Sequence, residues 1–398
     1  MRFLTFIITL TAFLAAAVAP AAAATQADEP VRVSLITCYP GREVYELYGH
    51  TEIRVSTPGR DMVYNYGTFD FRAPNFMYRF VKGETDYMVM GYPTEYIFVG
   101  YERRKIVEQV LNLSPEEARR VKDALETNAR PENRTYRYNY VLDNCSTRPR
   151  DIIEAAVEVP IEYPAMTDTV TFRRMMHHYN VNYAWQQFGI DLALGSGLDY
   201  ELDLRKQMFA PISLMNAFAG ATILRDGERV PLVAATIIMN QGSDRGDILP
   251  PTPWYAHPLT LSIVLLVVGV LLSVRDVRRR RVCRVFDSAL FLVYFLAGCL
   301  LAFLVFVSTH EATSPNYNLL WLHPFYIIPA VLVWIKSAEK VVYCYHFLNF
   351  AVLLLTLILW WATPQCANAA FFPLMALPVV RSLSYIVVKR KCERKKVK

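Results

Sequence analysis

The sequence lacks the cysteine pattern of a disulfide-stapled or zinc-binding protein. Its seven cysteines are an odd number, lie far apart and include no CxxC pair. A disulfide framework and a zinc ribbon are therefore excluded as organising features. One bridge, between Cys38 and Cys145, is chemically allowed in an oxidising compartment, but we do not expect it. The sequence predicts neither a metal ion nor a cofactor.

Positive charge is also scarce outside two short stretches. The chain has a formal net charge of +6, yet residues 275–284 alone carry +5 and residues 389–398 carry +6. The rest of the chain is therefore near −5, which excludes a basic groove for nucleic acid. Both basic stretches flank hydrophobic runs, as topology signals of membrane proteins do.

Apolar residues are abundant instead. With 54% hydrophobic residues and a mean hydropathy of +0.20, the chain is too apolar for an ordinary soluble enzyme. Residues 1–24 are typical of a secretory signal peptide, because Met1-Arg2 precedes an apolar run and an alanine-rich stretch that ends in Ala22-Ala23-Ala24. An uncleaved first anchor is the alternative interpretation. Either interpretation predicts that the following domain is exported.

The C-terminal part predicts five transmembrane helices within residues 258–388. Each apolar run is close to the length that crosses a bilayer, although proline weakens the pattern in the third and the fifth. The runs cover about residues 259–274, 287–307, 319–335, 343–362 and 370–388. Because basic loops face the cytoplasm, we expect the tail, residues 389–398, inside and the exported domain outside.

Residues 25–257 have the composition of a single α+β domain. Alternating residues predict strands over 31–37, 51–56 and 62–66, and Pro58-Gly59 predicts the turn of a hairpin between the last two. Ser114 followed by Pro115 and two glutamates predicts a helix start. A second helix is expected to begin near Cys145.

Cys145 is the candidate nucleophile. It stands in the polar run Asp143-Asn144-Cys145-Ser146-Thr147, immediately before a run of helix formers. At a helix start, the macrodipole and free backbone N–H groups lower the pKa of a thiol and can hold an oxyanion. The alternative is a buried structural cysteine, which is the common state of a lone cysteine. The polar surroundings favour the catalytic interpretation.

His50 is the candidate base, because it begins a predicted strand directly after Gly49. A neutral imidazole in reach of the thiol can take its proton and later return it to a leaving group. Asn65, in the paired strand, is the first choice for the residue that orients the ring, with Asp70 and Tyr66 as alternatives. The many aromatic residues of 64–101 are expected either in the core of the domain and at its edge or on a surface that faces the membrane.

These motifs resemble those of a known family. The order of the motifs resembles that of the circularly permuted papain-like enzymes, a group close to the NlpC/P60 fold that includes lecithin:retinol acyltransferase. The motifs are a strand with His, a paired strand with Asn, and Asn-Cys at a helix start. The segments 48–55, 64–71 and 139–148, together with the multi-pass C-terminus, resemble the envelope lipoprotein N-acyltransferase family called Lnb. Tyr48, Asn144 and Arg148 lie in these segments and are candidate substrate-binding residues.

The resemblance implies a periplasmic thiol acyltransferase domain anchored in the inner membrane. It implies that Cys145 takes an acyl chain from a membrane phospholipid and passes it to the N-terminal amine of a lipidated protein, with His50 as base. The role of Asn65 in orienting the imidazole is implied only by the looser resemblance to the papain-like superfamily. Two alternatives stay open: a papain-like cell-wall peptidase, amidase or phospholipase, and a non-catalytic protein that handles lipids or lipoproteins. The donor's identity and the oligomeric state are not specified.

Overall fold

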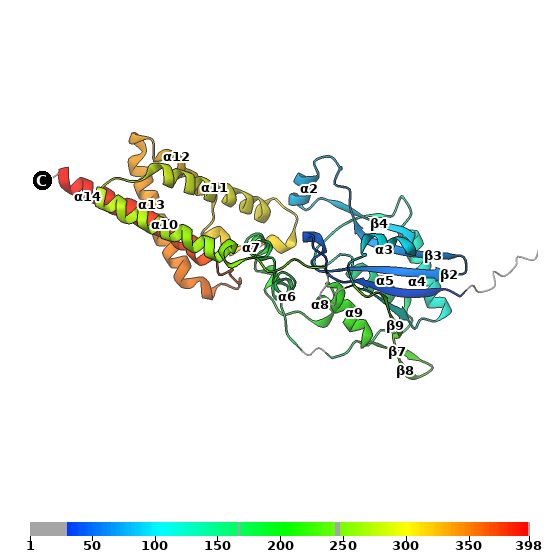
Figure 1. Ribbon diagram of the computed structural model, residues 1–398. Coiled ribbons are helices and arrows are strands. Elements are labelled where there is room, and N and C mark those ends of the chain that lie inside the picture. Colours follow the sequence, from blue (N-terminus) through cyan, green and yellow to red (C-terminus); the bar gives the residue numbers. More distant parts are fainter. Residues whose placement is uncertain (1–29, 166–167, 243–246, 397–398) are drawn as a thin grey trace, which may run out of the picture.

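The computed structural model describes residues 30–165, 168–242 and 247–396. A domain of sheet and helices comes first, and a bundle of long helices follows it (Figure 1). This order confirms the predicted α+β domain and helical membrane bundle. The predicted signal peptide, residues 1–24, lies outside the described residues.

The domain is built on one antiparallel sheet of seven strands in the order β6-β4-β3-β2-β1-β5-β9. The strands are β1 (Arg32–Cys38), β2 (His50–Thr57), β3 (Arg60–Thr68), β4 (Asp86–Pro93), β5 (Ile106–Leu111), β6 (Thr135–Arg137) and β9 (Val233–Asn240). A separate hairpin pairs β7 (Thr222–Arg225) with β8 (Glu228–Pro231). The sheet's centre is therefore the β1–β2–β3 group.

The predicted hairpin is β2–β3. Gly59 takes a φ of +80° in its turn, a conformation that glycine adopts without steric cost. The ladder places Glu52 opposite Asn65. Alternation along β2 sends Ile53 and Val55 into the core between sheet and helices, so His50, Glu52 and Arg54 belong to the opposite face.

Three helices cover one face of the sheet: α4 (Pro115–Asn128), α5 (Thr147–Ala156) and α9 (Pro211–Ala219). Ser114 caps α4 as predicted, since its side chain accepts the Glu117 amide and Glu117 reaches back to the Ser114 amide. The smaller helices are α2 (Phe76–Lys82), α3 (Ile97–Gly100), α6 (Phe172–Tyr179), α7 (Ala184–Ala193) and α8 (Leu204–Gln207).

The bundle contains α10 (Pro258–Arg279), α11 (Arg284–Phe306), α13 (Glu339–Leu359) and α14 (Phe371–Lys396). Within the described residues, these four helices are long and apolar enough to cross a membrane. Their packed interior is apolar and rich in aromatic rings, with Phe291, Trp321 and Phe371 among its buried side chains. The helical nature of four of the five predicted runs is thus as expected.

The third predicted run, residues 319–335, is not one long helix. It is a broken series of 3-10 turns at Tyr317–Leu320 and Pro324–Tyr326, followed by α12 (Ile327–Leu332). His323 is extended, with φ −126° and ψ 157°. A residue that precedes proline is disfavoured in helical conformation, so Pro324 interrupts the run there.

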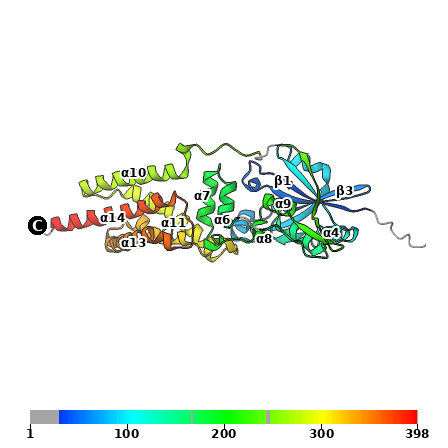
Figure 2. The same ribbon diagram turned by 90° about the horizontal axis from the view of Figure 1, so that it is seen from below.

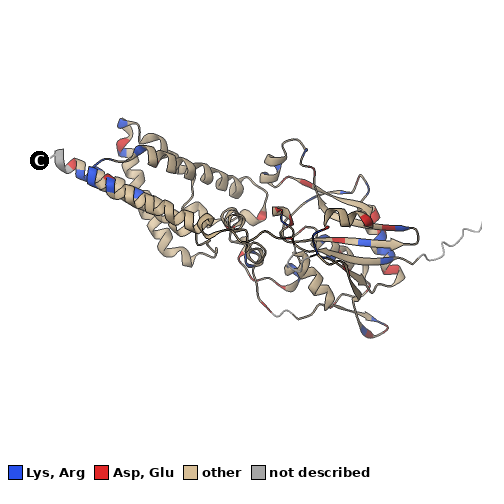
Figure 3. Ribbon diagram, in the orientation of Figure 1, with Lys and Arg blue, Asp and Glu red and all other residues tan. Residues whose placement is uncertain are grey.

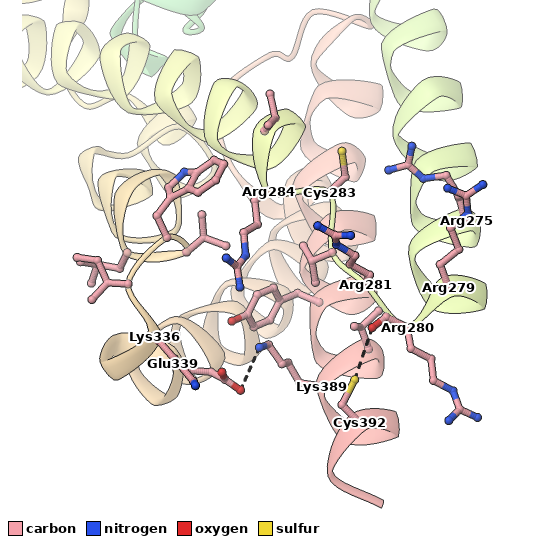
Figure 4. Close-up of a pocket in the computed structure, with 18 residues that line it drawn as sticks. Arg275, Arg279, Arg280, Arg281, Cys283, Arg284, Lys336, Glu339, Lys389 and Cys392 are labelled. Carbon is pink, nitrogen blue, oxygen red and sulfur yellow. Dashed lines mark hydrogen bonds and ion pairs between the residues drawn. The ribbon is translucent and has the colours of Figure 1, made fainter. Parts of the chain in front are cut away.

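The broken run joins the same two ends of the bundle as the long helices do. At the end near the domain, Asn318 Nδ2 donates to the Asp191 carbonyl oxygen at 3.0 Å. At the far end, Leu332 to Lys336 line a cavity of about 620 Å³ together with the end of α10, the start of α11 and the end of α14. Figure 4 shows the basic residues that gather there, and Figure 3 shows that Lys and Arg concentrate at this end of the bundle.

Helices α6 and α7 lie between the sheet and the bundle (Figure 2). Asp191 of α7 is fully buried and binds groups from both parts. Arg173 Nη1 and His177 Nε2 lie 3.1 and 2.7 Å from one carboxylate oxygen, and Asn368 Nδ2 donates to the other at 2.9 Å. Because a buried carboxylate needs such partners, this cluster fixes the domain against the bundle end that is opposite the basic cavity.

Candidate active site

The hairpin brings the imidazole and the predicted orienting amide together. His50 begins β2, Asn65 lies in β3, and His50 Nε2 is 3.0 Å from Asn65 Oδ1. Since an amide oxygen only accepts, Nε2 carries the proton of this bond and Nδ1 is left as the basic nitrogen. The two alternatives bind elsewhere: the Asp70 carboxylate accepts the Arg72 amide, and the Tyr66 hydroxyl accepts from Asn128.

Cys145 lies in the turn before α5, which begins two residues later than expected, at Thr147. Asn144 organises this turn, because its Oδ1 accepts the amides of Ser146 and Thr147 at 2.8 and 3.0 Å. Its Nδ2 donates to the carbonyl oxygens of Tyr140 and Phe209. The Asn144 side chain therefore holds the turn that leads into α5, whose N-cap residue is Ser146.

Cys145 and the imidazole of His50 both lie next to Gly67. This glycine has a φ of +102°, and a Cβ atom placed on it would lie 3.7 Å from Cys145 Cβ and 4.0 Å from His50 Cε1. A side chain at residue 67 would both strain the backbone and fill the space between the two groups. The sheet and the start of α5 thus bring together the residues predicted as nucleophile and base.

The protonation of this pair differs from the sequence-based expectation. Burial raises the pKa of the Cys145 thiol to about 11, against the lowering expected at a helix start. Loss of solvation on burial is the largest cause, and it outweighs the hydrogen bonds that favour the thiolate. The backbone N–H of Thr51 and the Ser146 side chain oppose the effect of burial by hydrogen bonding to the sulfur.

Burial also lowers the pKa of His50, to about 4. At neutral pH the resting pair is therefore a neutral thiol and a neutral imidazole. Such a histidine can accept a proton in the transition state, and the thiolate is formed only as the sulfur attacks. Cys145 keeps partial exposure to solvent, so a substrate can reach it.

Sequence reasoning missed Glu52, a fully buried carboxyl group behind the imidazole. Its Oε1 lies 3.7 Å from His50 Nε2 and accepts the hydroxyls of Tyr92 at 2.7 Å and Tyr101 at 3.3 Å. Its Oε2 is buried with no hydrogen-bond partner in the described part of the chain. Burial raises the pKa of Glu52 to about 7. Strand alternation is the signal that would have found it, since i and i+2 share a face.

The three predicted substrate-binding residues make contacts within the protein. Tyr48 is buried, and its hydroxyl accepts from Asn180 at 2.8 Å. The guanidinium of Arg148 binds both oxygens of Asp143, at 2.6 and 2.7 Å, and stacks on Tyr136. Asn144, described above, has both ends of its amide engaged. Their role in substrate binding stays a prediction.

The described residues hold no cluster of three or more His, Cys, Asp or Glu side chains arranged for a metal ion. Cys38 and Cys145 are both free thiols. Cys38 is buried opposite His50 in the β1–β2 ladder.

Comparison with known families identifies both parts of the chain. Residues 19–176 match the family model described as the Lnb N-terminal periplasmic domain, and residues 251–392 match the Lnb transmembrane domain. The chain belongs to the Lnb family. Membership implies an acyltransferase, and it makes this Lnb protein a membrane protein with a periplasmic domain. Comparisons with curated proteins and with solved structures found no significant match.

Proposed function

We propose that this Lnb protein is a lipoprotein N-acyltransferase that works through a thioester on Cys145. The observation that supports the proposal is that Cys145 and His50 both lie next to Gly67, in a domain docked on one end of a membrane bundle. Both substrates, a phospholipid and a lipidated protein, reside in a bilayer leaflet. A thiol site attached to the same membrane meets them at a high effective concentration.

In the first half-reaction, Cys145 Sγ attacks the ester carbonyl carbon of the phospholipid while its proton moves to His50 Nδ1. The carbon–oxygen ester bond breaks, and His50 returns the proton to the departing alkoxide. The products are a lysophospholipid and an acyl thioester on Cys145. The Asn65 amide holds the imidazole in the tautomer that this step needs.

In the second half-reaction, the N-terminal amine of the lipidated protein attacks the thioester carbonyl. The carbon–sulfur bond breaks, an amide forms, and the amine proton passes through His50 to the sulfur. Transfer from an oxygen ester to a thioester is close to neutral or uphill, whereas amide formation from a thioester is downhill. The pair of steps therefore proceeds without ATP.

The topology follows from the bundle. We infer that the broken run of Tyr317–Leu332 is a fifth membrane crossing, because it joins the domain end to the basic end as the four long helices do. An odd number of crossings puts the basic tail, residues 389–398, in the cytoplasm and the domain in the periplasm, with the chain in the inner membrane. The predicted signal peptide requires the same sidedness.

The proposal is tested on the products in the cell. Intact-mass spectrometry of envelope lipoproteins should show one additional acyl chain on the N-terminal amine in cells with the protein. Cells that carry Cys145→Ser should lack that chain, whereas cells that carry Cys344→Ser, a substitution of an exposed cysteine in the bundle, should keep it. Equal masses in all three strains would refute N-acylation by this protein.

A further inference from the structure

The segment 69–82, which includes α2 and the loop before it, exposes an unusual number of large apolar side chains. The exposed fractions are 65% for Phe71, 69% for Met77, 54% for Tyr78 and 45% for Phe80. We call this segment the aromatic lobe. A contiguous apolar surface of this kind on a protein indicates contact with a membrane or a partner rather than with water.

The aromatic lobe is fixed at the point where a membrane helix ends. The Tyr78 ring centroid lies 6.2 Å from that of Phe303, in the last turn of α11. The Lys82 carbonyl accepts the Thr309 amide at 2.8 Å, and the Phe80 carbonyl oxygen lies 2.8 Å from the ring nitrogen Nε2 of His310. Figure 1 shows α2 on the side of the domain that faces this end of α11.

The surroundings of the aromatic lobe fit a lipid leaflet. Arg72 has a side chain that is 95% exposed, next to Phe71, where its cation can reach lipid phosphates while the ring enters the acyl region. Trp254 and Tyr255 are 78% and 63% exposed just before α10 begins. Aromatic residues at the ends of membrane helices favour the headgroup layer, so they define a second anchor at the domain end of the bundle.

A series of aromatic rings leads from the lobe toward the site. Within the lobe, Phe76 stacks on Phe69 with ring centroids 5.7 Å apart. The Phe69 ring in turn contacts that of Tyr87, with centroids 4.9 Å apart. Tyr87 in turn stacks on Tyr138 at 4.1 Å. These rings form a continuous series of apolar contacts rather than isolated pairs.

The series ends beside the thiol. Tyr138 Cε2 lies 3.8 Å from the position that a Cβ atom on Gly67 would occupy, and Cys145 Cβ lies 3.7 Å from the same position. The rings therefore connect the exposed aromatic lobe with the position beside Gly67 that Cys145 and His50 share. An acyl chain that follows these rings brings its ester group toward Cys145.

We propose that the aromatic lobe inserts into the outer leaflet and that the acyl chains of a membrane phospholipid reach Cys145 along the rings of Phe69, Tyr87 and Tyr138. This inference rests on the proposed function, since it names the route of the acyl donor. It predicts that a donor dissolved in water does not need the lobe. Long-chain donors that stay in the bilayer do need it.

The test compares two acyl donors on one set of variants in nanodiscs. The lobe variant carries Phe71→Ser, Met77→Ser and Phe80→Ser. The control carries three matched exchanges of exposed apolar residues elsewhere in the domain, Val99→Ser, Leu224→Ser and Ile238→Ser. Acyl-Cys145 is measured by intact mass, first with the nanodisc phospholipid as donor and then with the soluble ester p-nitrophenyl acetate.

We expect the lobe variant to acylate Cys145 from phospholipid about tenfold more slowly, or slower still, and from the soluble ester at the unchanged rate. The control variant should keep both rates. Loss of both rates in the lobe variant would overturn the proposal, because the lobe would then support the site itself. An unchanged phospholipid rate would overturn it as well.

A second measurement does not depend on activity. A photoreactive benzoylphenylalanine in place of Phe80 should cross-link to nanodisc phospholipid, whereas the same group in place of Val99 should not. Cross-linking of residue 80 to protein alone would contradict insertion into the leaflet. If the unaltered protein forms no acyl-Cys145 from either donor, the proposed function fails, and the cross-link then still reports on the lobe separately.

Discussion

Replacing Glu52 by Gln should stabilise the domain at alkaline pH and leave it unchanged at acid pH. Glu52 is fully buried, and burial raises its pKa from the ordinary 4.5 to about 7. Between these two values the folded protein holds a proton that the unfolded chain has released. Stability is therefore lost as the pH rises through this window, and the loss is complete above pH 7.

The magnitude follows from the size of the shift. Each pKa unit corresponds to about 1.4 kcal/mol, so a rise from 4.5 to about 7 amounts to about 3 kcal/mol at pH 8. Glutamine keeps an oxygen for the hydroxyls of Tyr92 and Tyr101 and puts an amide where the carboxyl Oε2 has no partner. It also carries no charge at any pH, so the pH-dependent loss should disappear.

The assay is thermal unfolding of the purified protein in detergent at pH 5 and pH 8. The melting temperature of Glu52→Gln should exceed that of the unaltered protein by several degrees at pH 8, up to about 10 °C, and match it at pH 5. Glu108→Gln is the contrast, because Glu108 is buried but paired with Arg54 at 3.0 Å, and its replacement should destabilise at both pH values. A Glu52→Gln variant that melts below the unaltered protein at pH 8 would refute the reasoning.

Three further outcomes are expected. His50→Ala should slow formation of acyl-Cys145, followed by mass spectrometry of quenched samples, by about 10²-fold or more. Asn65→Ala should slow it by less, because Asn65 orients the ring without moving a proton. Equal effects of the two substitutions would contradict these separate roles. Asn144→Ala should lower the free energy of unfolding by about 1–3 kcal/mol, since it removes four side-chain hydrogen bonds that hold the turn before α5. An unchanged melting temperature would argue against this role. A reporter after Lys398 should be cytoplasmic and one inserted near Asp168 periplasmic; the same side for both would exclude five crossings.

Local signals were enough for much of the fold. Pro58-Gly59 predicted the β2–β3 turn, and Ser114 predicted the start of α4, because a turn and a capping box depend on a few neighbouring residues. Four of the five predicted apolar runs are long helices in the structure. The third run is broken before Pro324, and its overall hydrophobicity did not indicate this break.

For the candidate site, the sequence predicted which residues lie near one another better than it predicted their electrostatics. The order of His50, Asn65 and Cys145 in the chain suggested that they meet, and the structure brings the first two to 3.0 Å. The raised pKa of Cys145 was not predictable, because it comes first from tertiary burial and then from the nearby Glu52 carboxyl group. The same holds for Asp191, whose partners lie as far away in sequence as Asn368.

The central claim, an acyl chain carried on Cys145 and delivered to an amine, is tested most directly by following the adduct through both half-reactions. The purified protein in phospholipid nanodiscs should gain the mass of one acyl chain on Cys145, in a form that hydroxylamine removes. A synthetic lipidated peptide with a free N-terminal amine should then discharge the adduct and gain the same chain. An adduct that is lost only to water would make the protein a phospholipase, and acylation of the peptide by Cys145→Ser would contradict the thiol mechanism.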